Sequence, residues 1–336
     1  MLLRRAVIVL VLSLLATHGA IAQPPTERQG PNRGAVASRA PDGRPDLQGV
    51  WHYATATPLQ RFPEFADRPF ISDEEAAAWV VKQLSERSSD IRNKNPDTDL
   101  GRENNDFWFE RPVGMAKIDG RVMTSLVVDP PTGRVPILPK VAGGPPPDPN
   151  RADNPEDRNP GERCLAHPAG PPMVGGGPGS HYLQIVQIPS YIMLYAEAAN
   201  TARIISTIKR EHAPGDMRQW RGDSVGWWEG ETFVVETVNS RIGANLRGFG
   251  VAPPMSVRTG PDFHLIERFS LAAPDVLLYE FTVTNPKFFA QPWTARAPMA
   301  RTNARMFEFA CHEGNYGLAF ILRGARAAEK EARPQE

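Results

Sequence analysis

The chain has 336 residues, 41% of them hydrophobic, and its 38 lysines and arginines balance its 38 aspartates and glutamates. No block of basic residues stands out, so neither nucleic acid nor an anionic membrane surface is an expected partner. This length suffices for one large domain or two small ones, and we expect a single domain over residues 45–330.

The first 22 residues have the layout of a secretory signal peptide. Arg4 and Arg5 precede an apolar stretch over residues 6–15, and Ala20-Ile21-Ala22 supplies the small residues of a cleavage site. That stretch is well short of the roughly 20 apolar residues that span a bilayer. We therefore expect a periplasmic or secreted protein without an integral membrane span. Residues 23–44, poor in apolar side chains, are expected to be a flexible leader.

The chain has two cysteines, Cys164 and Cys311, and both lie in the part expected to be exported. An oxidising compartment favours a disulfide between them. It would close a loop of 147 residues (311 − 164), for which the chain-entropy model gives roughly 4–5 kcal/mol of stabilisation. A catalytic thiol or a metal thiolate is the alternative, but the chain has no Cys-x-x-Cys spacing.

One helix is predicted near the N-terminus of the expected domain. Ser72 and Glu75 have the spacing of a capping box, and Ala76, Trp79 and Val80 follow them, which predicts a helix over residues 73–87. A strand is expected over Arg121–Val128, ended by prolines. Residues 130–180 are rich in proline and glycine and are expected to form a long loop.

The second half of the chain predicts antiparallel β structure. Residues 222–237 hold two β-branched and aromatic runs that meet at Glu229-Gly230, which is typical of a hairpin. A short helix is expected at the tail, over residues 318–331. The many short strands predicted in this half of the chain, at hairpin spacing, indicate a mainly β fold, an antiparallel calycin-like barrel or a sandwich, with one N-terminal helix and long Pro/Gly-rich loops. The expected strands are Tyr182–Ile188, Tyr191–Ala196, Ala202–Ile208, Val225–Glu229, Thr232–Val238, Phe263–Phe269, Leu277–Thr284, Thr294–Ala300 and Met306–Cys311.

Several motifs resemble those of a group of secreted bacterial proteins of unassigned function. They are the segment 41–51 (PDGRPDLQGVW), the hairpin at 222–236, Pro292-Trp293-Thr294 and the segment 310–316 (ACHEGNY). This resemblance implies a shared architecture and no activity. Separately, Gly49-Val50-Trp51 resembles the Gly-x-Trp of calycin (lipocalin-like) barrels. There the tryptophan packs on a basic side chain near the C-terminus, which implies Arg323 as the partner here.

Three acidic or basic side chains are candidates for acid–base catalysis. His312 lies in the polar segment 310–316, and a histidine titrates near neutrality. Glu267 and Glu280 lie on neighbouring predicted strands, where they would share a lumen if their faces turn inward, and paired carboxylates supply an acid and a base. The alternatives are a structural histidine beside the disulfide and outer-face acids paired with Arg268 or Arg203.

A ligand pocket is expected at the open end of the predicted barrel, lined by tryptophans, of which Trp227 and Trp228 alternate in direction along one strand. Its candidate ligand-binding residues are Trp220, Trp228, Trp293, Glu236, Arg203 and Asn315. Ser224 lies in a Gly-x-Ser-x-Gly pattern, but a hairpin follows it, so we expect a turn serine.

The histidines His167, His181, His212, His264 and His312 are scattered without a metal-binding motif, so no metal or cofactor is expected. Three functions stay open. The first is an exported binding protein for a small organic or sugar-like ligand. The second is a hydrolase or lyase that uses His312 with a carboxylate, and the third is an envelope protein that docks a partner.

Overall fold

The computed structural model describes residues 38–87, 114–139, 152–158, 162–165, 170–173, 181–198, 201–208, 210–241, 245–247, 256–258 and 260–332. These residues belong to the compact unit Asn32–Glu336. The predicted signal peptide and residues 23–37 of the predicted leader lie outside the described residues. Residues 38–44, also predicted as leader, form a hydrogen-bonded turn in which the Ala40 N–H donates to the carbonyl of Arg44 at 2.9 Å.

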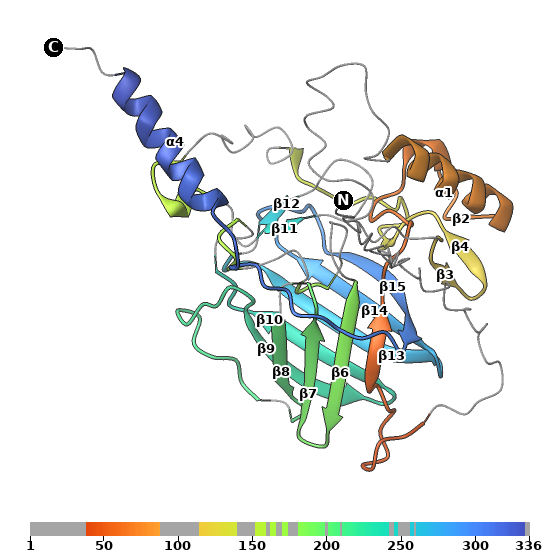
Figure 1. The fold of residues 1–336 in the computed structure, drawn as a ribbon. Helices are drawn as coiled ribbons and strands as arrows, with labels where there is room; N and C mark the ends of the chain where they lie inside the picture. Colours follow the sequence, from red (N-terminus) through yellow and green to blue (C-terminus); the bar gives the residue numbers. More distant parts are fainter. Residues whose placement is uncertain are drawn as a thin grey trace, which may run out of the picture. The chain divides into compact units, whose positions relative to one another are not determined.

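The fold is mainly β, as the sequence predicts (Figure 1). The described residues contain the helices α1 (Asp73–Arg87) and α4 (Gly317–Ala332). Their strands are β1 (Gly49–His52), β2 (Phe70–Ile71), β3 (Lys117–Ile118), β4 (Arg121–Met123), β5 (Val127–Asp129), β6 (Tyr182–Ile188), β7 (Tyr191–Ala196), β8 (Thr201–Ser206), β9 (Asp223–Glu229), β10 (Thr232–Val238), β11 (Asn245–Arg247), β12 (Ser256–Arg258), β13 (His264–Ala273), β14 (Val276–Thr284) and β15 (Trp293–Thr302).

Ten of these strands form one antiparallel sheet in the order β8-β7-β6-β1-β15-β14-β13-β10-β9, with β5 paired to β15. Strands that are consecutive along the chain pair within the runs β8-β7-β6, β15-β14-β13 and β10-β9, and β1 lies between β6 and β15 and joins the first run to the second. The terminal strands β8 and β9 are not paired with each other among the described residues. Their side chains nevertheless meet, because Arg203 on β8 donates to the Ser224 hydroxyl on β9 at 3.1 Å.

One face of the large sheet carries the core. Along β13, Leu265, Glu267 and Phe269 are completely buried, and along β14 Tyr279 and Phe281 are also completely buried. The alternating residues between them are partly exposed, as the two-residue period of a strand requires. Aromatic and aliphatic side chains therefore fill this face, and the core is packed with side chains.

The helix α1 confirms the predicted capping box and its bounds. The Glu75 N–H donates to the Ser72 hydroxyl at 3.2 Å, and the Ser72 N–H donates to the Glu75 carboxylate at 3.0 Å. The buried face of α1, with Trp79, packs with Val122 of the three-stranded sheet β2-β4-β3 (Figure 1). The helix and this sheet form a second, smaller hydrophobic cluster. Among the described residues, no helix is both long enough and apolar enough to cross a membrane.

The predicted strands Tyr182–Ile188, Tyr191–Ala196 and Thr232–Val238 are found with those bounds. Most of the others differ only at their ends. The tail helix is confirmed as α4, and Gly324 lies within it despite the low helix propensity of glycine. The described parts of the predicted loop at 130–180 contain a short 3₁₀ helix, Pro155–Asp157, and no strand.

Two strand predictions were wrong. Met306–Cys311 is not a strand, because the Phe307 N–H donates to the Glu197 carboxylate at 2.7 Å instead of to a neighbouring strand. The segment Arg121–Val128 is divided into β4 and β5, which pair with β2 and β15 in different sheets. A run of β-forming residues predicts an extended backbone, but it does not predict which neighbouring strand pairs with that backbone through hydrogen bonds.

The basic partner of Trp51 is Arg301, not Arg323. The Arg301 guanidinium lies 4.2 Å from the centre of the Trp51 ring, because β1 pairs with β15 and places the two residues opposite each other. The Trp51 indole N–H donates to the carbonyl of Leu47 at 2.9 Å. Arg323, on α4, lies over Phe320 instead.

Candidate functional site

Two polar networks lie on the opposite faces of β9, β10 and β13. The hairpin of β9 and β10 confirms the prediction at 222–237, with Gly230 at φ +60° in its turn. Gly226 permits a close approach to β8, since a Cβ atom there would lie 2.6 Å from Phe233 and 2.8 Å from Ile205. This approach brings the side chain of Arg203 across to β9 and β10.

The inner network is built around a buried ion pair between Arg203 and Glu267. Two guanidinium nitrogens of Arg203 donate to the two carboxylate oxygens of Glu267 at 3.0 and 2.6 Å. The exposed fractions of the two side chains are 7% and 0%. Arg203 also donates to Thr237 at 3.3 Å, in addition to its bond to Ser224. Burial opposes the charge on Arg203, but Glu267 outweighs it and raises the pKa of the guanidinium.

Tyr279 completes this inner network. Its hydroxyl donates to Glu267 at 2.8 Å and accepts the Met173 N–H at 3.0 Å. Burial and the negative charge of Glu267 raise the pKa of Tyr279 well above its usual value. The Tyr279 hydroxyl, the Glu267 carboxylate and the Arg203 guanidinium are therefore linked by hydrogen bonds inside the sheet. The segment that contains Met173 is thereby attached to the core.

The outer network begins at Asp223, whose side chain is 7% exposed. Arg210 and the Ala213 N–H donate to its carboxylate at 2.6 and 2.9 Å, and the Nδ1 atom of His212 lies 2.9 Å from it. Burial alone would raise the pKa of Asp223, but these hydrogen bonds outweigh it and hold the pKa at about 2. Asp223 is thus an anion that fixes the imidazole of His212.

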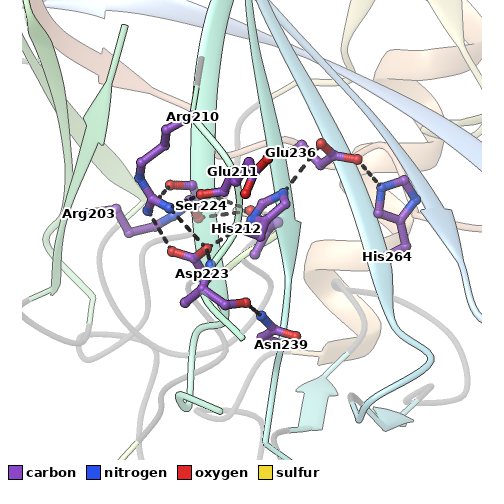
Figure 2. A network of polar contacts seen from close by, with 11 residues as sticks. Arg203, Arg210, Glu211, His212, Asp223, Ser224, Glu236, Asn239 and His264 are labelled. Atoms are coloured by element: carbon purple, nitrogen blue, oxygen red, sulfur yellow. Dashed lines mark hydrogen bonds and ion pairs between the residues drawn. The ribbon is translucent and has the colours of Figure 1, made fainter. Parts of the chain in front are cut away.

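The outer network continues from His212 to His264 through Glu236 (Figure 2). The Nε2 atom of His212 lies 3.3 Å from one Glu236 oxygen, and the Nε2 atom of His264 lies 2.7 Å from the other. Burial opposes ionisation of Glu236, but the two histidines outweigh it and lower the pKa of its carboxyl. His212 Nε2 is buried and makes no hydrogen bond of acceptable geometry within the described residues. The Glu236 carboxylate at 3.3 Å is the ionisable group that faces this nitrogen.

The predicted catalytic residues are not brought together. Glu267 lies inside the sheet with Arg203, whereas Glu280 lies on the opposite face and pairs with Arg296 at 2.6 Å. The register explains this, because Glu280 is opposite Arg268 and not opposite Glu267. His312 is exposed in the turn after Cys311, and its carbonyl accepts the Asn315 N–H.

The predicted disulfide is confirmed, with Cys164 and Cys311 joined and their Cα atoms 5.8 Å apart. Asn315, predicted to bind ligand, contacts this bridge. Its side-chain amide donates to the Glu162 carbonyl at 3.1 Å and approaches the Cys164 sulfur at 3.2 Å. In this structure the Asn315 side chain therefore packs against the disulfide.

The predicted pocket tryptophans have separate surroundings. Trp293 is 2% exposed and packs edge-on against Phe281 and Phe289 in the core. Trp228 packs against Phe233, and Trp220 lies under the guanidinium of Arg241. Trp227, on the other face from Trp228, donates to Glu229. The predicted ligand residues Arg203 and Glu236 belong instead to the inner and the outer network, respectively.

His212 and Asp223 were not predicted as site residues from the sequence. His212 lies in a segment without secondary structure, 11 residues before Asp223, and no local spacing links the two. Ser224, expected in a turn, lies on β9 and bonds to Thr237 at 2.9 Å. Within the described ranges, no group of three or more His, Cys, Asp or Glu residues is placed to hold a metal ion.

Comparison with protein-family models, with curated proteins and with solved structures finds no match to this chain.

Proposed function

We propose that this protein is an exported enzyme of the acid–base type, a hydrolase or a lyase, in which His212 exchanges the proton. The observation that carries this proposal is the position of its imidazole between two carboxylates. Asp223 faces Nδ1 at 2.9 Å, and Glu236 faces Nε2 at 3.3 Å. This arrangement replaces the pairing of His312 with Glu267 or Glu280 as the acid–base candidate.

Each residue of the outer network has a distinct role in this proposal. The Asp223 carboxylate accepts the Nδ1 proton of His212, which leaves the Nε2 lone pair as the base. Arg210 and the Ala213 N–H keep Asp223 ionised and in place. Glu236, held by His264, lies beside Nε2 and stabilises the imidazolium that forms when His212 takes a proton from water or from a substrate.

Turnover of a panel of chromogenic esters, phosphoesters and glycosides tests this proposal. We expect His212→Ala to lower kcat/KM on any accepted substrate by about 10²–10⁴-fold, the usual contribution of a general base. His312→Ala is the matched control, since His312 is an exposed histidine outside the network, and it should leave the rate unchanged. Full activity in His212→Ala, or a wild-type protein inactive on the whole panel, contradicts the proposal.

For the fold, we propose a calycin-like barrel in which β8 and β9 are the last neighbours to meet. The antiparallel pairing throughout the ten-stranded sheet, the contact of Arg203 with Ser224 and the stacking of Arg301 on Trp51 support it. Such barrels commonly hold small molecules, so binding of a small organic ligand is the second candidate function. Because side chains fill the core, that ligand would bind at an end of the barrel.

A further inference from the structure

The outer face of β6, β7 and β8 is apolar and uncharged. Val186, Met193 and Ile204 lie side by side in one row across the three strands, and Ile188 and Tyr191 lie opposite each other in the next row. These side chains point away from the core, because Ile204 is 70% exposed and Ile188 is 53% exposed. None of the outward-facing residues of the three strands is charged. They are Tyr182, Gln184, Val186, Ile188, Tyr191, Met193, Tyr195, Ala202, Ile204 and Ser206.

The other half of the large sheet has a charged outer face. Arg268 on β13 pairs with Glu229 on β9 at 2.6 Å, and Arg296 on β15 pairs with Glu280 on β14 at 2.6 Å. Exposed apolar side chains that gather in one patch commonly mark a surface that binds another molecule. The outer face of β6, β7 and β8 is therefore a candidate docking face, here called the sheet face.

The helix α4 presents a second exposed apolar surface. Phe320, Gly324 and Ala327 follow one another at helical spacing along one side of α4, and Phe320 is 60% exposed. Another side of the helix is anchored, because Arg326 donates to the Asp153 carbonyl at 2.8 Å. The apolar side of α4 is thus left open while the helix itself is attached to the chain.

The sheet face and the apolar side of α4 match in size and in charge. The 16 residues of α4 span about 24 Å, and the seven residues of β6 also span about 24 Å. A helix is about 10 Å across, and three strands about 4.8 Å apart form a strip about 14 Å wide. Neither apolar row contains a charged side chain, so contact between them would bury no unpaired charge.

We propose that α4 of one copy of this chain docks on the sheet face of a second copy, and that a two-fold axis repeats the contact in the opposite direction. The occupant is a second copy because one chain supplies both surfaces and leaves both exposed. Each contact covers about 240 Å² on either side, from the dimensions of the helix. Two contacts therefore bury about 1,000 Å² in total, near the lower limit of a specific interface, so the dimer is weak, with a Kd in the micromolar range.

Sedimentation velocity over a concentration series in the micromolar range measures this dimer, with the disulfide intact and without reference to any activity. We expect a monomer–dimer equilibrium that goes no further than the dimer. Ile204→Asp on the sheet face and Phe320→Asp on α4 should each weaken the dimer by roughly tenfold or more. Val81→Asp is the matched control and should dimerise like the wild-type protein, since Val81 is an apolar residue of α1 that is 68% exposed and lies outside both surfaces.

An equimolar mixture of Ile204→Asp and Phe320→Asp distinguishes this contact from a dimer that joins two sheet faces or two helices. The mixed dimer keeps one intact contact, between α4 of the Ile204→Asp copy and the sheet face of the Phe320→Asp copy. It should therefore form at a lower concentration than the dimer of either variant alone.

Several results would overturn the proposal. They are a wild-type protein that stays monomeric or forms assemblies larger than a dimer, wild-type affinity in Ile204→Asp or Phe320→Asp, an equal loss in Val81→Asp, and no gain on mixing. Should Ile204→Asp fail to fold, Val186→Lys changes a residue of the same row and should also weaken the dimer. An undiminished affinity in that variant would contradict the proposal as well.

Discussion

Replacing Glu267 by glutamine should destabilise the protein strongly, although the two side chains have nearly the same shape. Glu267 is completely buried, and its oxygens accept two hydrogen bonds from Arg203 and one from Tyr279. Glutamine presents an NH₂ group where an acceptor is needed, and it leaves the Arg203 guanidinium buried without a counter-charge. Breaking a buried ion pair on one side costs about 3–5 kcal/mol, and we expect this loss in the free energy of unfolding.

Urea denaturation followed by far-ultraviolet circular dichroism measures this loss for Glu267→Gln, Arg203→Met and the double variant Arg203→Met/Glu267→Met. Because the double variant leaves no unpaired charge, it should recover most of the stability. A loss below about 1 kcal/mol in Glu267→Gln would refute the reasoning. So would a double variant as unstable as the sum of the single variants, because the two side chains would then act independently.

Three further predictions follow from separate parts of the structure. Replacing Cys164 and Cys311 by serine should lower the free energy of unfolding by roughly 4–5 kcal/mol, and non-reducing mass spectrometry should find no free thiol in the wild-type protein. The pKa of Asp223 falls from 3.8 to about 2, which contributes about 2 kcal/mol at neutral pH. Because the pKa is depressed on folding, this stability is present above about pH 4 and is lost as the pH falls through about 2, so Asp223→Asn should differ from the wild-type protein in urea unfolding at pH 7 and much less at pH 2. Arg301→Met removes the cation above Trp51 and should cost about 0.5–2 kcal/mol in thermal unfolding, and an unchanged Tm would show that this contact carries no net energy.

Features that depend on neighbouring residues were predictable from the sequence, whereas contacts between residues far apart in the chain were not. The capping box at Ser72 and the hairpin turn at Gly230 were predictable because each depends on residues within a few positions. The partner of Trp51 was not, since Arg301 lies 250 residues away and is opposite Trp51 only because β1 pairs with β15.

The placement of Glu267 and Glu280 in the candidate site also depended on contacts that the sequence did not predict. Alternation along a strand indicates that Glu267 and Glu280 each share a face with their own neighbours, but it cannot relate the faces of two strands. The register of β13 with β14 decided that Glu267 lies in the core and Glu280 on the other face.

The sequence by itself determined the β-rich class, most strand positions and the disulfide between Cys164 and Cys311, because propensity, turn chemistry and the presence of only two cysteines are local or compositional properties. The tertiary structure alone decided which charges meet. The chain returns over the outer face of β9 and β10, and this return places His212 between Asp223 and Glu236. Hydrogen bonds and ion pairs require atoms about 3 Å apart in space. The number of residues between two positions in the chain does not determine whether they come this close.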